Sequence, residues 1–209
     1  MAPLRELVEE IVALNGQEIR ILRPREADQF LDEEAFDTDE YMPYWAELWP
    51  SALVLSRVVA GRSLRGARTL ELGCGLGLVG IAAALAGGRV VATDWAPDAL
   101  EVTVQNAARN GVTIETERCD WAHPEPIIDG APWDLVLASD VLYEERYLEL
   151  IPGLLPRLVE DGEIWLAEPG RTVAAGFRDG VERDFHVDTT EHRIGGVTVL
   201  VHRLRRRRS

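Results

Sequence analysis

The sequence predicts an α/β fold, a doubly wound, mostly parallel sheet of seven strands that finishes in an antiparallel C-terminal hairpin. Two observations carry this prediction. From residue 66 onward, short apolar runs alternate with helical stretches, which is typical of a parallel sheet covered by helices on both faces. The last two strand-like segments, residues 184–194 and 197–204, are separated only by Gly195-Gly196, and two glycines between strands favour a tight hairpin.

The elements of the sheet follow in a regular order. Strands are expected at residues 67–72, 89–94, 112–119, 133–140 and 162–168, and helices at residues 78–86, 97–110 and 144–160. Pro97 suits the first turn of a helix, and Gly111 suits a helix end. Pro152 and Pro156 are expected to break the last helix, because proline lacks the backbone donor. The run at 133–140 is apolar throughout, which indicates a central strand.

The first 60 residues are expected to form an N-terminal extension and lid on the core, residues 61–209, within a single domain spanning 1–209. We expect a helix at the N-terminus, then a short strand near residues 17–24. The acidic region that follows, residues 25–40, is interpreted as a solvated face, and the alternative is a surface that attracts a basic substrate. An aromatic-rich segment then leads into a helix through SALVLSRVVA.

Composition excludes several classes of function. The net charge is −14 and the pI about 4.7, so most of the surface would repel a nucleic-acid backbone. We expect a soluble, cytoplasmic protein without a membrane partner, because no apolar run reaches the length of a membrane-spanning helix and the N-terminus does not resemble a signal peptide. Neither cysteine belongs to a CxxC pair, and the four histidines lack metal spacing, so we expect no metal. His186, His192 and His202 are expected at the surface.

The glycine-rich stretch ELGCGLGLVG marks the candidate ligand site. It fits two templates, because Gly75-x-Gly77-x-x-Gly80 matches the dinucleotide fingerprint and Glu71 followed by alternating glycines matches an acid-plus-glycine pattern. A strand leads into the loop and a helix follows it, which aims backbone N–H groups at a ligand. Asp94 ends the next strand, where a carboxylate can bind both hydroxyls of a ribose. On these features NAD and S-adenosylmethionine fit equally well.

Three further features favour S-adenosylmethionine over NAD. Glu71 would repel a pyrophosphate, whereas the ammonium of a methionine moiety suits it, directly or through water. Asp120-Trp121 closes the third strand, where a carboxylate can accept from an adenine amino group and an indole can lie against a base. The C-terminal hairpin fits a methyltransferase sheet, whereas a dinucleotide domain prefers a sixth parallel strand.

With these residues in place, the chain resembles the class I, seven-stranded S-adenosylmethionine-dependent methyltransferases, and more narrowly the branch that methylates lysines of folded, non-histone proteins. The resemblance rests on WPSALVLS (49–56), ELGCGLG (71–77), Asp94, Asp120-Trp121 and SDVLY (139–143). Asp140 and Tyr143 match that branch's D-x-x-Y motif. PYWAELWP (43–50) and EPGR (168–171) are similar to the enzymes that methylate the β subunit of the electron-transfer flavoprotein, where the second piece usually begins with Asp. The resemblance covers about residues 41–171 and implies a Rossmann-like sheet.

The resemblance also implies roles for single residues. The implied cofactor is S-adenosylmethionine, and the residues implied to hold it are Trp49, Glu71, Gly73, Cys74, Gly75, Gly77, Asp94, Trp95, Asp120, Trp121 and Ser139. The implied catalytic residues are Asp140, Tyr143 and Glu168. The implied substrate-binding residues are these three with Trp45 and Arg171, although Trp45 fits the cofactor side equally well.

A lysine acceptor sets a chemical requirement. The amine must be neutral to attack, since its free pKa is about 10.4. An aromatic-walled channel would lower this pKa by desolvation, whereas carboxylates favour the charged amine. A carboxylate is therefore better suited to capture and orient the amine than to activate it. Asp140, at the end of the central fourth strand, is assigned to hold the incoming amine, with Tyr143 shaping the channel and Glu168 as a secondary contact.

Alternatives to the protein-lysine methyltransferase stay open at this stage. The first is a small-molecule N- or O-methyltransferase on the same fold, because fold and cofactor do not determine the acceptor. A nucleotide-binding dehydrogenase and a non-enzymatic binding module are weaker alternatives, the first opposed by Glu71 and Asp120-Trp121 and the second by the intact cofactor motifs. The chain contains no lysine. Coding bias explains this most simply, and an enzyme protected from methylating itself is the rival explanation.

Overall fold

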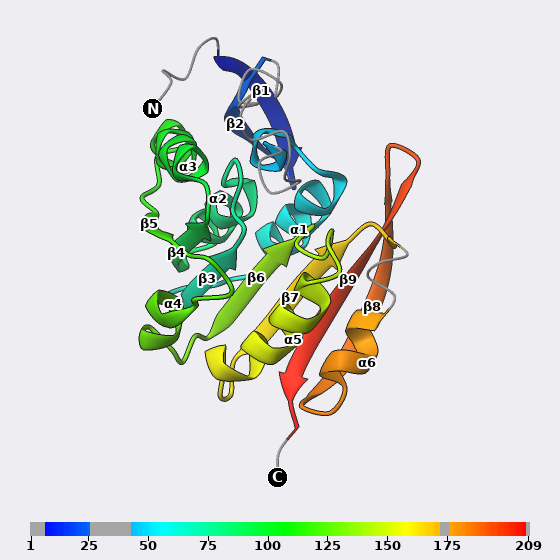
Figure 1. Cartoon of the computed structure of the whole chain (residues 1–209). Helices are drawn as coiled ribbons and strands as arrows, with labels where there is room; N and C mark the ends of the chain where they lie inside the picture. The colour runs from blue at the N-terminus through cyan, green and yellow to red at the C-terminus, as the bar shows by residue number, and fades with distance from the viewer. Residues whose placement is uncertain (1–6, 26–42, 172–175, 208–209) are drawn as a thin grey trace, which may run out of the picture.

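The computed structural model describes residues 7–25, 43–171 and 176–207 and contains a seven-stranded sheet of order β5-β4-β3-β6-β7-β9-β8 (Figure 1). The strands are β3 (Arg68–Leu72), β4 (Arg89–Asp94), β5 (Glu115–Arg118), β6 (Leu135–Ser139), β7 (Glu163–Glu168), β8 (Phe185–Ile194) and β9 (Val197–Arg206). The strands from β3 to β7 pair in parallel, and β9 runs antiparallel to both β7 and β8. The predicted fold class is confirmed, including the C-terminal hairpin.

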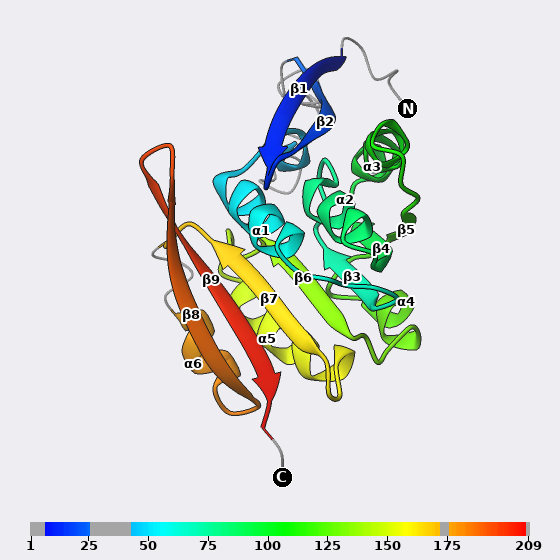
Figure 2. The ribbon, with the colours of Figure 1, turned by 180° about the vertical axis from the view of Figure 1, so that it is seen from behind.

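Helices cover both faces of this sheet (Figures 1 and 2). The helices are α1 (Pro50–Ala60), α2 (Leu78–Leu85) and α3 (Pro97–Arg109) on one face, and α4 (Glu125–Asp129), α5 (Tyr147–Leu158) and α6 (Phe177–Val181) on the other. The strand β6 lies at the centre and supplies both hydrophobic cores, because successive side chains point to opposite faces. Leu135 and Leu137 join the core under α1 and α2, whereas Val136 and Ala138 join the core under α5. This explains why its sequence is apolar throughout.

The strand order places the candidate site. The chain winds from β3 outward to β4 and β5, then returns to β6 on the other side of β3. In open parallel sheets, ligands bind outside the carboxyl ends of the strands at such a switch point. The glycine loop after β3 and the SDVLY segment at the end of β6 therefore lie next to each other at the carboxyl ends of the strands.

The N-terminal segment differs from the sequence prediction. Instead of a helix, residues 7–14 form a strand, β1 (Leu7–Leu14), which pairs antiparallel with β2 (Gln17–Pro24) along its whole length. The turn between them is Asn15-Gly16, and both residues have positive φ, 48° and 87°. An Asn-Gly pair between apolar runs is a strong hairpin signal, and it accounts for the strand found in place of the helix. The predicted strand at residues 17–24 is confirmed.

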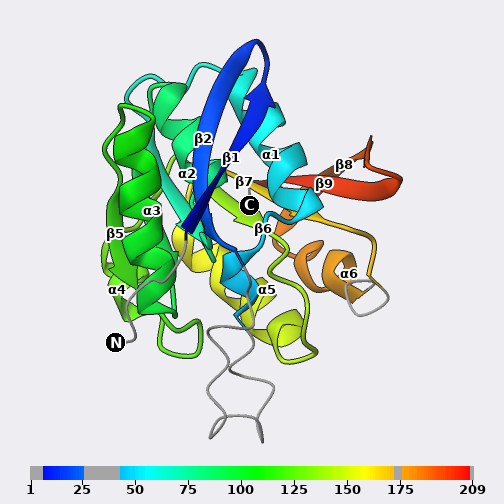
Figure 3. The ribbon, with the colours of Figure 1, turned by 90° about the horizontal axis from the view of Figure 1, so that it is seen from above.

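In this hairpin, β1 packs against α1 and β2 against α3, and the view from above shows the hairpin on top of the molecule (Figure 3). A two-stranded hairpin is marginal on its own, so its attachment to the core matters. The side chain of Asn106 on α3 is one part of that attachment, because its Oδ1 accepts from the N–H of Leu22 (2.7 Å) and its Nδ2 donates to the Leu22 carbonyl (3.0 Å). The same Nδ2 donates to the carbonyl of Leu76 (2.9 Å) in the glycine loop. One buried amide therefore fixes both the extension and the loop.

Two smaller predictions also need correction. Helix α5 runs unbroken from Tyr147 to Leu158 with Pro152 and Pro156 inside it, because its apolar side packs into the core formed with β6 and β7 and offsets the lost backbone bonds. His202 is buried, not exposed, because β9 is an inner strand flanked by β7 and β8.

Some expectations fall beyond the described part of the chain. The acidic region predicted for residues 25–40 lies outside the described residues except for Arg25. Within the described ranges, no helix is long and apolar enough to cross a membrane.

Candidate active site

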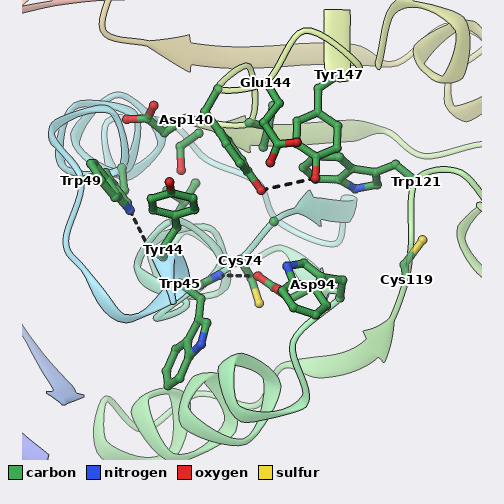
Figure 4. A pocket seen from close by; sticks show the side chains of 18 of the residues that line it. Tyr44, Trp45, Trp49, Cys74, Asp94, Cys119, Trp121, Asp140, Glu144 and Tyr147 are labelled. Atoms are coloured by element: carbon green, nitrogen blue, oxygen red, sulfur yellow. Dashed lines mark hydrogen bonds between the residues drawn. The ribbon is translucent and has the colours of Figure 1, made fainter. Parts of the chain in front are cut away.

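A cavity of about 670 Å³ opens at the carboxyl ends of the parallel strands (Figure 4). Its wall is built from the loops that follow β3, β4, β5, β6 and β7, together with the 3₁₀ helix η4 (Tyr44–Ala46) and the start of α1. This volume lies within the range typical of small-molecule and cofactor sites. Figure 4 shows Asp140, Tyr44 and Trp49 on one side of the cavity, and Asp94 and Trp121 on the other.

The glycine loop brings backbone to the cavity wall. Gly73 and Gly75 have positive φ, 65° and 53°, a conformation that side chains disfavour. A Cβ on Gly73 would come within 3.3 Å of the Trp121 ring, and one on Gly75 would come within 3.1 Å of the Trp45 carbonyl oxygen. Both predicted glycines line the cavity, whereas Gly77 lies behind it as the N-cap of α2. The loop therefore exposes polar backbone that larger residues would cover.

Asp94 is fixed by this loop. Its Oδ2 accepts from the N–H of Gly75 and its Oδ1 from the N–H of Ala96, both at 3.0 Å. The side chain is buried and lines the cavity. Burial raises the pKa of this carboxyl above its ordinary value, and the backbone bonds oppose that shift. The Asp94 carboxylate is thus held in one orientation at the carboxyl end of β4.

The loop after β5 supplies a second acid and an indole. Asp120 is exposed at the rim, and its Oδ1 accepts from the N–H of Ala122 (2.9 Å), which lowers the pKa of this carboxyl. The ring of Trp121 packs edge-on against Tyr147, with centroids 4.9 Å apart. Both predicted residues line the cavity. An acid that stays ionised and a fixed aromatic face therefore meet at this end.

The remaining predicted cofactor residues also reach the wall. Trp49, Cys74, Trp95 and Ser139 line the cavity. The Cys74 thiol is buried and lies 3.4 Å from the Thr103 hydroxyl. Burial raises the pKa of this thiol well above its usual range, so it acts as a small neutral side chain.

Asp140 is held by side chains from two other segments, Ser51 and Arg171. It follows β6 with a positive φ of 57°, rare for a residue with a side chain, and its N–H donates to the Ala167 carbonyl (2.9 Å). Its Oδ2 accepts from the Ser51 hydroxyl (3.2 Å), and its Oδ1 accepts from Nη2 (3.0 Å) and Nε (3.2 Å) of Arg171. Burial raises the pKa of this carboxyl, and the charge of Arg171 opposes the shift.

A row of aromatic rings, Tyr44, Tyr143, Tyr147 and Trp121, crosses the cavity wall, and we call it the aromatic row. Neighbouring rings meet edge to face, with centroids 5.3, 5.0 and 4.9 Å apart. The Tyr143 hydroxyl lies 3.5 Å from that of Tyr147, and burial raises the pKa of Tyr143 above its usual range. Trp49 extends the row, because its ring lies 6.2 Å from that of Tyr44 and its Nε1 donates to the Tyr44 carbonyl.

Sequence reasoning missed two aromatic residues of this wall and one residue behind it that binds Asp140. Tyr44 and Tyr147 belong to the aromatic row, and Ser51 binds Asp140. Tyr143 precedes α5 and Tyr147 begins it, and their rings meet because the chain turns between them. Trp45, which the sequence analysis left between the cofactor side and the substrate side, lines the cavity. Its backbone carbonyl lies close to Gly75.

The structure brings two predicted acids near the cavity but not to its wall. Glu71 is buried behind the loop, with one carboxylate oxygen against Gly80 and without a hydrogen-bond partner. Glu168 points away, because its Oε2 accepts from the N–H groups of Gly170 (2.6 Å) and Arg171 (3.2 Å). Glu168 fixes the turn that carries Arg171.

The sheet and the glycine-lined cavity define the class of protein, a methyltransferase of the S-adenosylmethionine-dependent fold. The solved ribosomal protein L11 methylase of Lactobacillus delbrueckii subsp. bulgaricus has the same fold, with a TM-score of 0.57, 25% identity, and coverage of 73% of this chain and 77% of that one. A lysine methyltransferase family model matches residues 37–173. The chain belongs to this family, which confirms the resemblance drawn from its motifs.

The curated relatives are named as lysine or arginine methyltransferases of proteins. EEF1A lysine methyltransferase 3 of Mus musculus is 34% identical over 78% of this chain and 72% of its own length. The electron transfer flavoprotein beta subunit lysine methyltransferase of Xenopus laevis is 32% identical, over 62% of this chain and 53% of its own length. Histone-arginine methyltransferase METTL23 of Mus musculus is 33% identical, over 53% and 46%. The chain thus spans about half the length of the last two relatives.

Proposed function

We propose that this chain transfers a methyl group from S-adenosylmethionine to the side-chain amine of a lysine in a protein substrate. The observation that carries the proposal is Asp140, a buried carboxylate that faces an aromatic-walled cavity from the end of the central strand. Such a site can admit the alkyl chain of a lysine along its rings and orient the amine at its end. The family membership supports the same acceptor.

The residues present fit the cofactor. Gly73 and Gly75 leave room where a Cβ would meet a ring or a carbonyl, and Asp94 presents a fixed carboxylate for a ribose. Asp120 and Trp121 stand at the far end, where an adenine would find an acceptor and an aromatic face. The bound cofactor supplies the electrophilic methyl group, so the protein has to position the acceptor and exclude water.

The acceptor side meets the requirement for a neutral amine through its rings. The rings of Tyr44, Tyr143 and Trp49 give the cavity wall apolar surface, and desolvation against such surface disfavours the ammonium form. Asp140 can accept a hydrogen bond from the amine and hold its lone pair toward the methyl group. Tyr143 shapes the channel. Glu168 does not contact the amine itself but accepts from the N–H of Arg171 and so fixes the turn that carries Arg171.

An arginine acceptor in a protein is the second candidate, because one relative is named a histone-arginine methyltransferase. Its guanidinium would also find Asp140 at the end of the cavity. A small-molecule amine or hydroxyl is the third candidate, since the fold does not determine the acceptor. A cytoplasmic location stays a prediction.

A labelling experiment tests the proposal. Purified protein and methyl-tritiated S-adenosylmethionine are incubated with a cell lysate, the protein and small-molecule fractions are separated, and the labelled protein is hydrolysed to identify the methylated amino acid. We expect methyl-lysine in one or a few protein bands. Label on the enzyme band cannot be methyl-lysine, because this chain has no lysine.

Asp140→Ala is the matched inactive variant. It should reduce transfer by about 100-fold or more through loss of positioning, while S-adenosylhomocysteine still binds in calorimetry. Asp188→Ala, which removes an exposed acid on β8, controls for loss of charge. Methyl-arginine, label only in small molecules, or unchanged turnover in Asp140→Ala would each overturn the proposal.

A further inference from the structure

Arg171 makes the closest charged contact to the acceptor carboxylate. Its Nη2 and Nε both donate to Oδ1 of Asp140, at 3.0 and 3.2 Å, and its guanidinium lies over the Trp49 ring at 5.7 Å. The Asp140 side chain is only 5% exposed, so this ion pair is shielded on the side of the acid. Ser51 occupies the other carboxylate oxygen. Asp140 therefore enters the reaction already paired.

The Asp140–Arg171 ion pair affects two opposing requirements of the reaction, which are to orient the acceptor amine and to keep that amine neutral. An unpaired carboxylate beside a lysine would favour the ammonium form, which cannot attack a methyl group. An aspartate whose charge is compensated can still accept a hydrogen bond, but it attracts a second cation far less. The positive charge of Arg171, on the same wall, further disfavours an ammonium.

We propose that Arg171 is the counter-ion that lets Asp140 orient the acceptor amine without holding it in the charged, unreactive form. This proposal rests on the proposed function and assigns to Arg171 a positioning role through Asp140. The proposal also gives a reason for the hydrogen bonds that hold the turn 168–171, because this turn positions Arg171. Glu168 accepts from the N–H of Arg171, and its other oxygen lies 3.5 Å from the buried His202.

The other charged groups around the cavity are arranged differently. The remaining charged side chains on its wall are Glu47, Asp94, Arg118, Asp120, Glu144 and Arg146. Arg118 donates to the Trp95 carbonyl, and Arg146 pairs with Glu144 at 2.8 Å. The negative charge of Glu168, on β7, raises the pKa of Asp140 and so acts against the effect of Arg171. The hydroxyls of the aromatic row and the Cys74 and Cys119 thiols are the other titratable groups on the wall.

The first test needs no turnover. Binding of n-butylamine, a mimic of the lysine side chain that is charged at pH 7.5, is measured by calorimetry on the protein saturated with S-adenosylhomocysteine. Arg171→Gln is expected to bind this cation at least 5-fold more tightly than the unmodified protein, because Asp140 has lost its counter-ion. Asp140→Asn/Arg171→Gln should lose the gain. Arg157→Gln removes an exposed arginine on α5 as the matched control.

The second test uses the pH profile of methyl transfer to the substrate found by labelling. Arg171→Gln should move the acidic limb of kcat upward by about one pH unit, a shift typical of a charge change at such distances. Arg171→Lys should restore the profile, with intact-mass measurement to check that the introduced lysine is itself unmodified. A merely structural role would lower activity without moving the limb.

The outcomes separate this inference from the proposed function. Weaker or equal butylamine binding in Arg171→Gln, or an acidic limb that stays in place, overturns the role of Arg171 whatever the substrate proves to be. Absence of methyl-lysine in the labelling experiment overturns the proposed function instead, and the binding test still reports on Arg171. Tighter binding that disappears in the double variant supports the inference.

Discussion

The two sides of the cavity are built in different ways. On the side of Asp94, backbone forms part of the wall, with glycines at positive φ and a carboxylate fixed by two N–H groups. On the side of Asp140, the wall is made by side chains that bind each other, with Ser51 from α1 and Arg171 from the loop after β7. The first side depends on short-range geometry, and the second depends on three segments far apart in the sequence.

This difference matches the different tasks. A cofactor common to many enzymes can be held by a backbone cradle that varies little. An acceptor differs from one substrate to the next, and side-chain contacts can change without disturbing the fold. Substitutions on the first side should therefore affect cofactor affinity, and those on the second should affect transfer.

The largest effect is expected from Asp94→Ala. Loss of the carboxylate removes the ribose contact and leaves the N–H groups of Gly75 and Ala96 without their partner. We expect the affinity for S-adenosylhomocysteine to fall by about 100-fold or more, equivalent to roughly 3 kcal/mol. Calorimetry measures this, with Asp98→Ala in the first turn of α3 as the control. Affinity within 3-fold of the unmodified protein would place the cofactor elsewhere.

Glu71→Gln tests the buried acid behind the glycine loop. Burial raises the pKa of Glu71 to about 8 from 4.5, so the folded state keeps a proton that the unfolded chain has released in this window. The Glu71 contribution to stability is therefore fully present below about pH 4.5 and is lost as the pH rises toward 8, by up to about 1.4 kcal/mol per pH unit.

Urea unfolding between pH 5 and 8 checks this expectation. The free energy of unfolding of Glu71→Gln, minus that of the unmodified protein, should increase as the pH rises. Glu115→Gln, an exposed acid on β5, is the control for loss of a carboxyl group. A difference that stays constant with pH would show that Glu71 is ionised in the folded protein.

Gly75→Ala should have an intermediate effect on the cofactor side. The backbone conformation disfavours a side chain, and the new Cβ would lie 3.1 Å from the Trp45 carbonyl oxygen. We expect a loss of about 1–2 kcal/mol in unfolding free energy, together with weaker cofactor binding. Gly153→Ala, at a helical position on α5 with open space around it, provides the comparison and should be neutral or stabilising. Equal stability of the two variants would contradict the strain at Gly75.

The smallest effect is expected from Ser51→Ala on the acceptor side. This change removes one hydrogen bond of 3.2 Å to Asp140 and leaves the Arg171 pair in place. A bond of this kind contributes about 0.5–1.5 kcal/mol, so kcat should fall by roughly 2- to 10-fold with unchanged cofactor affinity. Ser56→Ala, on the same helix but bonded to a local carbonyl, is the control. A change in cofactor affinity would mean that the two sides are not separable.

The sequence by itself determined the parallel sheet, its C-terminal hairpin and most of the cofactor side. These features depend on local patterns, since strand and helix periods, glycine spacing and an acid at a strand end can each be recognised within a few residues. The N-terminal hairpin was equally local, because Asn15-Gly16 predicts it. The predicted N-terminal helix did not take this turn into account.

Only the tertiary structure decided how the acceptor side is assembled. The motif containing Asp140 was visible in the sequence, but its pairing with Ser51 and Arg171 joins residues 89 and 31 positions away. Nothing local indicates that Glu71 and Glu168 turn away from the cavity or that His202 is buried. Such choices depend on burial and on the partner that each polar group finds, and both are properties of the packed molecule.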